Sequence, residues 1–261
     1  MDSHNVMLDP RSAIALRAVI AIIAAAVGGL IGVMGRQASH KVLCGMVSFA
    51  AGALLAVTVI HIVPETVEMI DLLPAVLTVT GGVVLFALIG KYVYFMCPAC
   101  AASATEHDTG YLRLGILLLI SMSIHSTVDG LAIAAGSATL SYVGVLILFA
   151  VSYHKVPEGL ALVSVARLAG YGRGRALLIT LLIELTTALG ALIGLFFLSG
   201  VSELALGITL GIVAGSFLYT VGFAMLREMF VHERMSIFLY VGLGVASIVV
   251  TGLLIPHGPT H

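Results

Sequence analysis

The sequence predicts an all-α protein that crosses a lipid bilayer eight times. Hydrophobic residues make up 60% of its 261 residues and charged residues only 10%, and the mean hydropathy is +1.16. A soluble domain carries about 25% charged residues, so this composition excludes that class. The apolar residues fall into segments of about 20, the length that an α-helix needs to span the hydrocarbon core. A net charge of −1 gives no reason to expect a nucleic acid partner.

Eight apolar segments follow one another, separated by short polar or Gly- and Pro-containing connections. The predicted helices are about 13–34, 43–62, 74–95, 112–136, 142–167, 176–199, 204–226 and 236–255. None of the connections is long enough for a soluble domain, so we expect a single transmembrane domain over 1–261. The 29 glycines suit helices that pack closely inside a membrane. The N-terminus has no basic stretch followed directly by an apolar core, so we expect the first helix itself to direct membrane insertion.

The distribution of Lys and Arg predicts that both termini lie on the external side. Cytoplasmic loops of membrane proteins carry an excess of these residues. With both ends outside, nine of the twelve Lys and Arg residues fall at internal connections, namely Arg36, Lys41, Lys91, Arg113, Arg167, Arg173, Arg175, Arg227 and Arg234. The external connections carry acidic residues instead, including Glu65, Glu68, Asp71 and Glu203.

A short motif occurs twice, as HSTVDG from His125 and as HKVPEG from His154. Each copy has a histidine followed four residues later by a carboxylate, Asp129 in the first and Glu158 in the second. Residues four apart lie on one face of a helix, so each pair projects together. The fourth and fifth helices are antiparallel neighbours, and both histidines fall about halfway along them. The repeat therefore predicts two facing half-sites at the same membrane depth.

Two imidazoles and two carboxylates form a nitrogen and oxygen ligand set suited to Zn, Fe, Mn or Co. Each ionisable group at the bilayer centre costs at least about 2.5–3.5 kcal/mol on insertion scales, so such groups indicate function. A single buried histidine is usually a packing residue, and His–carboxylate pairs also serve proton relays. Two copies with matched spacing and depth favour a metal site over both alternatives.

Three residues beside the motif favour room for an ion and close helix packing. Pro157 removes a backbone donor within the fifth helix and frees the carbonyl of Tyr153, which predicts a kink there. Gly130 and Gly159 follow the two carboxylates directly and permit neighbouring helices to approach closely.

The segments HSTVDGLAIAAG and HKVPEGLALVSVA resemble the fourth and fifth helices of the ZIP family of divalent-metal transporters. Further similarity lies in HIVPET after the second helix and in AGSFLYTVGFAMLREM of the seventh. The resemblance covers nearly the whole chain and implies a bundle of eight helices with both termini outside. It also implies a homodimer and a rocking or elevator-like motion.

The resemblance implies roles for individual residues. The family's primary metal site is matched by His125, His154 and Glu158. An adjacent second site is matched by Asp129 and Ser126. Asp129 is expected either to bind the metal itself or to hold a metal ligand in place. Lys155 stands where members that bind two metals have an acidic ligand. An ammonium has no lone pair and repels a cation. We therefore expect Lys155 to pair with Asp129 as a tethered substitute for the second metal, and one transported ion at the centre.

Other residues have weaker signals. Glu184 lies within the sixth helix and is either a hydrogen-bonded core residue or a residue bordering the metal path. His61, Glu65 and Glu68 end the second helix on the external side, where they suit an entrance that concentrates cations.

Cys97, Cys100 and His107 lie in the internal connection between the third and fourth helices. One CxxC is too few ligands for a structural zinc site, which normally has four. They are either an ordinary loop or a modest cytosolic exit site.

We expect a multi-pass protein of the plasma (inner) membrane that imports a divalent transition metal into the cytoplasm by alternating access. Zinc is the first candidate, with iron, manganese, cobalt and cadmium as others. No GxxxxGK[ST] motif is present, so we expect no bound nucleotide. Low pH should weaken uptake if the histidines must be neutral to bind metal. Two alternatives stay open, an intramembrane zinc enzyme, although no HExxH is present, and a proton-coupled carrier of an organic solute.

Overall fold

A computed structural model of the chain describes residues 9–34, 40–93, 111–139, 141–198, 200–226 and 234–255. Every regular element in these ranges is helical, and eight helices are long and apolar enough to cross a membrane. The elements are α1 (Pro10–Met34), α2 (His40–Val57), η1 (Thr58–Ile62), α3 (Val63–Ile70), α4 (Leu72–Val93), α6 (Tyr111–Ala138), α7 (Ser141–Leu168), α8 (Arg173–Glu184), α9 (Thr186–Leu198), α10 (Glu203–Tyr219), η2 (Thr220–Leu226) and α12 (Arg234–Leu254). The predicted all-α fold with eight spans is confirmed.

The second span is longer than predicted. Helical structure continues from α2 through the π-helical η1 into α3 and ends only at Asp71, whose φ of 64° is left-handed. Pro64 does not stop the helix because it lies in the first turn of α3. At that position the absence of a backbone N–H costs little hydrogen bonding within α3. The wide turn of η1 is closed by the N–H of Val63, which donates to the carbonyl of Thr58. The segment expected to be a loop after residue 62 is therefore mostly helix.

The sixth span is divided into α8 and α9, a break that the sequence did not predict. Leu185 separates the two helices directly after Glu184. The hydroxyl of Thr186 donates to two carbonyls at this point, that of Ile183 at 2.7 Å and that of Ser123 on α6 at 3.0 Å. The contact with Ser123 ties the break to α6.

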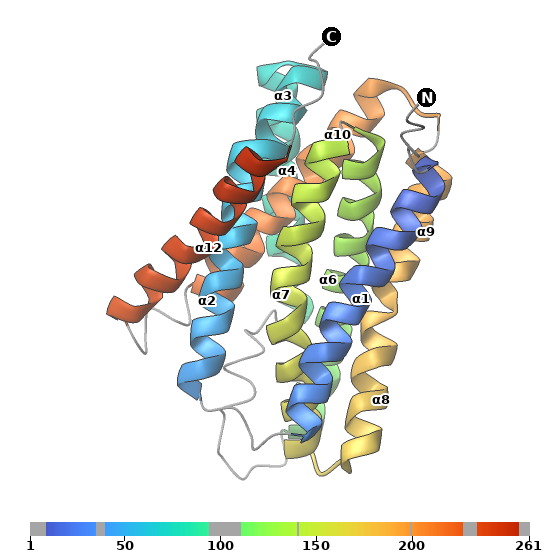
Figure 1. Ribbon diagram of the computed structural model, residues 1–261. Coiled ribbons are helices and arrows are strands. Elements are labelled where there is room, and N and C mark those ends of the chain that lie inside the picture. Colours follow the sequence, from blue (N-terminus) through green and yellow to red (C-terminus); the bar gives the residue numbers. More distant parts are fainter. Residues whose placement is uncertain are drawn as a thin grey trace, which may run out of the picture.

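For description we divide the helices drawn in Figure 1 into two groups, within each of which reciprocal glycine contacts join pairs of helices. The first group holds α1, α6, α7, α8 and α9, and the second holds α2, η1, α3, α4, α10, η2 and α12. In four helix pairs, a Cβ added to a glycine of either helix would meet a backbone carbonyl of the other. These pairs are α1 with α7 through Gly28 and Gly159, α6 with α9 through Gly130 and Gly190, α2 with α12 through Gly52 and Gly244, and α4 with α10 through Gly82 and Gly215.

Such contacts let helix backbones approach within a membrane, where no hydrophobic effect drives helices together. Among the described glycines, none with so tight a contact faces the other group. Between the groups, α7 packs on α2 and, less extensively, on α12, while α6 packs on α10.

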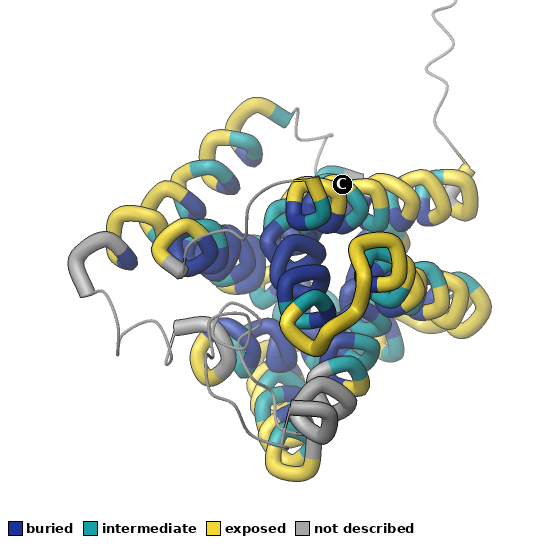
Figure 2. Tube along the Cα trace, turned by 90° about the horizontal axis from the view of Figure 1, so that it is seen from below, coloured by how far each residue is buried: buried dark blue, intermediate teal, exposed yellow. Residues whose placement is uncertain are grey.

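Buried residues lie along the inside of the bundle and exposed ones along its outside (Figure 2). In the most apolar window of each span, 67% of α7 but only 17% of α4 is buried. The outward residues of α4 are mainly apolar, including Leu73, Leu77 and Leu88, as expected of a lipid-facing helix. Thus α7 is a central helix. The start of α1 and the end of α12 lie at the same end of the bundle (Figure 1).

Candidate metal centre

The two copies of the repeated motif meet between α6 and α7. His125 and Asp129 come from α6, and His154 and Glu158 come from α7. One ligand atom from each of the four lies within 4.8 Å of the others, and all four residues are buried. The spacing of four residues places both members of each pair on one helix face, and the packing of α6 on α7 brings the faces together.

His154 has a hydrogen-bond acceptor at both ring nitrogens. Its Nδ1 lies 3.1 Å from the carbonyl oxygen of Ala150, and its Nε2 lies 3.0 Å from Oδ2 of Asp129. A neutral imidazole has one N–H, so it satisfies only one of these acceptors. The other contact is satisfied by a protonated ring, by a proton on Asp129, or by a cation between the nitrogen and the carboxylate. When Nδ1 donates to the carbonyl, the lone pair of Nε2 points towards Asp129, which is the tautomer a metal site uses.

The other two members complete the cluster. Nε2 of His125 lies 3.7 Å from Oδ2 of Asp129, and the two imidazole rings are 5.3 Å apart between centroids. Oε2 of Glu158 lies 3.9 Å from Nε2 of His154. Two ring nitrogens and two carboxylates therefore lie close together, and their mutual distances are similar to the roughly 3.3 Å that separates neighbouring ligand atoms about 2.0 Å from one tetrahedral ion.

Lys155 lies directly beside this cluster and is fully buried. Its Nζ is 3.0 Å from Oδ2 of Asp129, 3.1 Å from Oε2 of Glu158 and 2.8 Å from Oε2 of Glu184. It also donates a hydrogen bond of 2.7 Å to Ser126. The ammonium thus has four oxygen neighbours, which offset the cost of burying its charge.

Glu184 and Ser126 both contact the Lys155 ammonium. Glu184 comes from the end of α8, at the break before α9, and is fully buried. The hydroxyl of Ser126 accepts from Lys155 and donates to Oε1 of Glu158 at 3.2 Å. The sequence indicated Glu184 and Ser126 and predicted that Lys155 pairs with Asp129. It did not predict that Lys155 would also contact Glu158 and Glu184. The signal in the sequence for the role of Glu184 was that a carboxylate lies inside an apolar helix.

Comparison with known proteins identifies the family. The sequence model described as "ZIP Zinc transporter" matches residues 97–252. The chain belongs to the ZIP zinc transporter family. It is 30% identical over 210 residues to the zinc transporter ZupT of Chlorobium chlorochromatii, which covers 74% of this chain and 78% of that protein. It is 31% identical over 209 residues to the zinc transporter ZupT of Corynebacterium efficiens, with coverage of 74% and 78%.

Membership in the ZIP family decides between the classes of function that the sequence left open. The protein is a multi-pass membrane transporter of divalent metal and not an intramembrane enzyme. The buried cluster on α6 and α7 has the donor set for such a substrate.

The residues expected to shape the site lie next to it in this ZIP protein. Pro157 lies inside α7, and helical structure continues past it to Leu168. A Cβ on Gly130 would meet the carbonyl of Thr187, and one on Gly159 would meet the carbonyl of Ala25. The predicted close helix approach at these two glycines is confirmed.

The candidate entrance residues are separate from the cluster. His61 lies in η1, and Glu65 and Glu68 lie in α3. Glu65 is buried and Glu68 is exposed, although both were expected in a solvated loop. Cys97, Cys100 and His107 lie outside the described residues.

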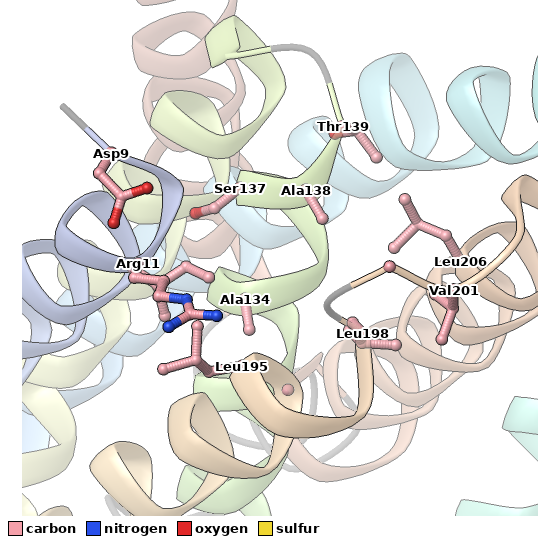
Figure 3. A pocket seen from close by; sticks show the side chains of 13 residues that line it. Asp9, Arg11, Ala134, Ser137, Ala138, Thr139, Leu195, Leu198, Val201 and Leu206 are labelled. Atoms are coloured by element: carbon pink, nitrogen blue, oxygen red, sulfur yellow. The ribbon is translucent and has the colours of Figure 1, made fainter. Parts of the chain in front are cut away.

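A cavity of about 500 Å³ lies at the end of the bundle where α1 begins (Figure 3). Its walls come from the start of α1, the C-terminal ends of α6 and α9, and the start of α10. Asp9, Arg11 and Leu206 are among the lining residues. No residue of the metal cluster lines it, so it is distinct from the candidate site.

Proposed function

We propose that this protein imports zinc, or another divalent transition metal, into the cytoplasm through a single site on α6 and α7. The observation that carries the proposal is His154, whose ring nitrogens both face acceptors. When Nε2 of His154 is unprotonated, its lone pair faces the carboxylate of Asp129, and the two groups repel each other. A divalent cation bound between them would be coordinated by both. Family membership supports divalent metal as the transported substrate.

His125, His154 and Glu158 act as the ligands of the transported ion in this proposal. Asp129 is either a fourth ligand or a group that orients His154, because its Oδ2 also lies 3.0 Å from the ammonium of Lys155. Ser126 holds Lys155 and Glu158 in position through two hydrogen bonds.

Lys155 takes the place of a second metal ion. Three ionised carboxylates and one ammonium leave a charge that a single divalent cation neutralises. A second divalent cation would meet the repulsion of Lys155 at close range. The contacts of Lys155 with three carboxylates therefore support a single transported ion. They also support Glu184 as an ion-pair partner of Lys155 and not as a metal ligand.

Import is the direction that the family resemblance implies, and the proposed orientation places both termini outside. The start of α1 and the end of α12 lie at the same end of the bundle, which supports termini on one side, and the basic residues at the other connections support that side as external. Acidic residues near the external end, Glu65 and Glu68, suit the entry of a cation. A homodimer and a location in the plasma (inner) membrane remain predictions from the family resemblance.

Alternating access has a structural counterpart in the two helix groups. Glycine contacts hold each group together, whereas the described glycines make no contact as tight across the interface between the groups. The first group carries the metal cluster, so its movement against the second group would carry the ion from one side towards the other.

Transport by purified protein in liposomes tests the proposal. His154→Ala should abolish zinc uptake and lower the amount of bound zinc, because it removes the ligand at the centre of the cluster. Ser164→Ala is the matched control, since Ser164 is buried on the same helix and donates to the carbonyl of Leu160, away from the cluster. Undiminished uptake by His154→Ala would reject this site, and competition by other divalent metals in the same assay ranks the substrates.

A further inference from the structure

The outer start of α7 meets the second helix group at four polar side chains, here called the outer cluster: Tyr142 of α7, His61 of η1, and Glu65 and Glu68 of α3. Tyr142 belongs to the first group and the other three to the second. The rings of His61 and Tyr142 are in edge contact, with centroids 6.4 Å apart. Glu65 and Glu68 follow His61 in the next helix, where they lie three residues apart on one face of α3. The outer cluster therefore spans the interface between the groups.

The surrounding helices hold the outer cluster in place. A Cβ added to Gly252 of α12 would lie 3.5 Å from Nε2 of His61 and 3.8 Å from Cδ1 of Leu146, so the imidazole lies between α12 and α7. Glu65 is only 8% exposed, which limits its carboxylate to a few orientations.

An apolar layer separates the outer cluster from the metal cluster. Ile147 and Val151 of α7 precede His154 by seven and three residues, so they share its helix face, and both are fully buried. They belong to the same packed core as Leu54 and Val57 of α2. Tyr142 lies twelve residues before His154, about 18 Å along the helix. Along α7, Tyr142 of the outer cluster comes first, then this layer, and then His154 of the metal cluster.

We propose that Tyr142 closes the outer end of the ion path by docking on His61, Glu65 and Glu68, and that it leaves them when the path opens. The proposal rests on the proposed function, because it requires the two groups to move against each other. Tyr142 is on the helix that carries His154 and Glu158, so movement of α7 necessarily carries the phenol past the second group. With Tyr142 docked, its ring is in edge contact with the imidazole of His61, beside the helix that carries the carboxylates expected to attract an incoming cation.

Thiol labelling of the apolar layer tests this assignment. Val151→Cys, in a chain whose native cysteines are replaced by serine, reports access from the outside to a membrane-impermeant maleimide in right-side-out vesicles. In the Tyr142→Ala background, labelling should be about tenfold faster, the change expected for loss of a ring contact and a polar contact of ordinary strength. Tyr142→Phe keeps the ring and loses the hydroxyl, so it should give a smaller increase, as should Glu65→Gln.

Tyr240→Phe is the matched control, because Tyr240 lies on α12 against Gly45 and outside the outer cluster. Unchanged labelling in Tyr142→Phe, Tyr142→Ala and Glu65→Gln would overturn the assignment. If Tyr142→Ala does not fold, the two conservative variants decide. Zinc uptake by His154→Ala, measured in parallel, distinguishes failure of the proposed function from failure of the Tyr142 proposal. Undiminished uptake would reject the proposed function, whereas the labelling rates alone test whether Tyr142 closes the outer end.

Discussion

At the scale of single residues, Lys155 sets the charge of the candidate metal centre. Its ammonium contacts three carboxylates, so a fixed cation lies where a second ion would otherwise be expected. The family resemblance predicted that Lys155 pairs with Asp129, because Lys155 stands where members that bind two metals have an acidic ligand. It did not identify Glu184 as a partner, because Glu184 comes from a helix whose neighbours the motif does not specify.

Replacing Lys155 by methionine should strongly destabilise the metal-free protein. Removing one partner of a buried ion pair costs about 3–5 kcal/mol, because it leaves charges without compensation. Added zinc should restore part of the lost stability in Lys155→Met by binding the freed carboxylates. Thermal unfolding in detergent, with and without zinc, measures both effects. Lys91→Met, at an exposed position on α4, should unfold like the parent. Equal melting temperatures for both variants would contradict the fixed-cation role.

His61 and His125 should differ in what their loss impairs. His125→Ala removes a proposed ligand, so purified protein should retain less zinc and transport little. His61→Ala leaves the metal cluster intact, so bound zinc should be unchanged while the zinc concentration for half-maximal uptake rises. Metal content and uptake kinetics of the two variants distinguish a ligand from an entrance residue. Loss of bound zinc in His61→Ala would count against its separation from the cluster.

At the scale of helices, reciprocal glycines explain why particular pairs pack together. Gly130 on α6 and Gly190 on α9 each face a backbone carbonyl of the other helix, so any larger side chain must push the helices apart. This pair lies directly beside Asp129 and joins α6 to the span that carries Glu184. Close packing of the two helices therefore positions both carboxylates.

Gly130→Val should lower stability and uptake together. Overpacking of a dense interior costs about 1–3 kcal/mol, and the obstructing atom here is backbone that cannot turn aside. Gly81→Val is the control, since a Cβ at Gly81 would have no atom within 4 Å. Thermal unfolding and zinc uptake of the two variants check the expectation. A Gly130→Val protein as stable as Gly81→Val would show that α6 and α9 are not tightly joined.

At the scale of the whole molecule, two helix groups meet along an interface that includes α7 and α2. The metal cluster lies in one group, while His61, Glu65 and Glu68 lie in the other. An ion that passes from these residues to the cluster therefore crosses from one group to the other. This arrangement makes movement between the groups part of the proposed transport.

The orientation can be tested with single cysteines at exposed connections. Glu203→Cys, at the exposed first residue of α10, should react with an impermeant thiol reagent from outside intact cells. Gly172→Cys precedes α8 and should react only after the membrane is permeabilised, because it neighbours the basic residues Arg173 and Arg175. The reverse pattern would place both termini inside and contradict the proposed orientation.

The sequence alone was enough to predict the all-α class, the eight spans and the two facing half-sites. These features depend on local properties, namely the length of apolar segments and the helical period that joins His125 to Asp129 and His154 to Glu158. Only the tertiary structure revealed Glu184 at the ammonium of Lys155, the helix pairs joined by glycines, and Tyr142 against His61. Each depends on which helices are neighbours and how they are rotated, and hydropathy carries little information about either inside a membrane, where lipid and protein are equally apolar.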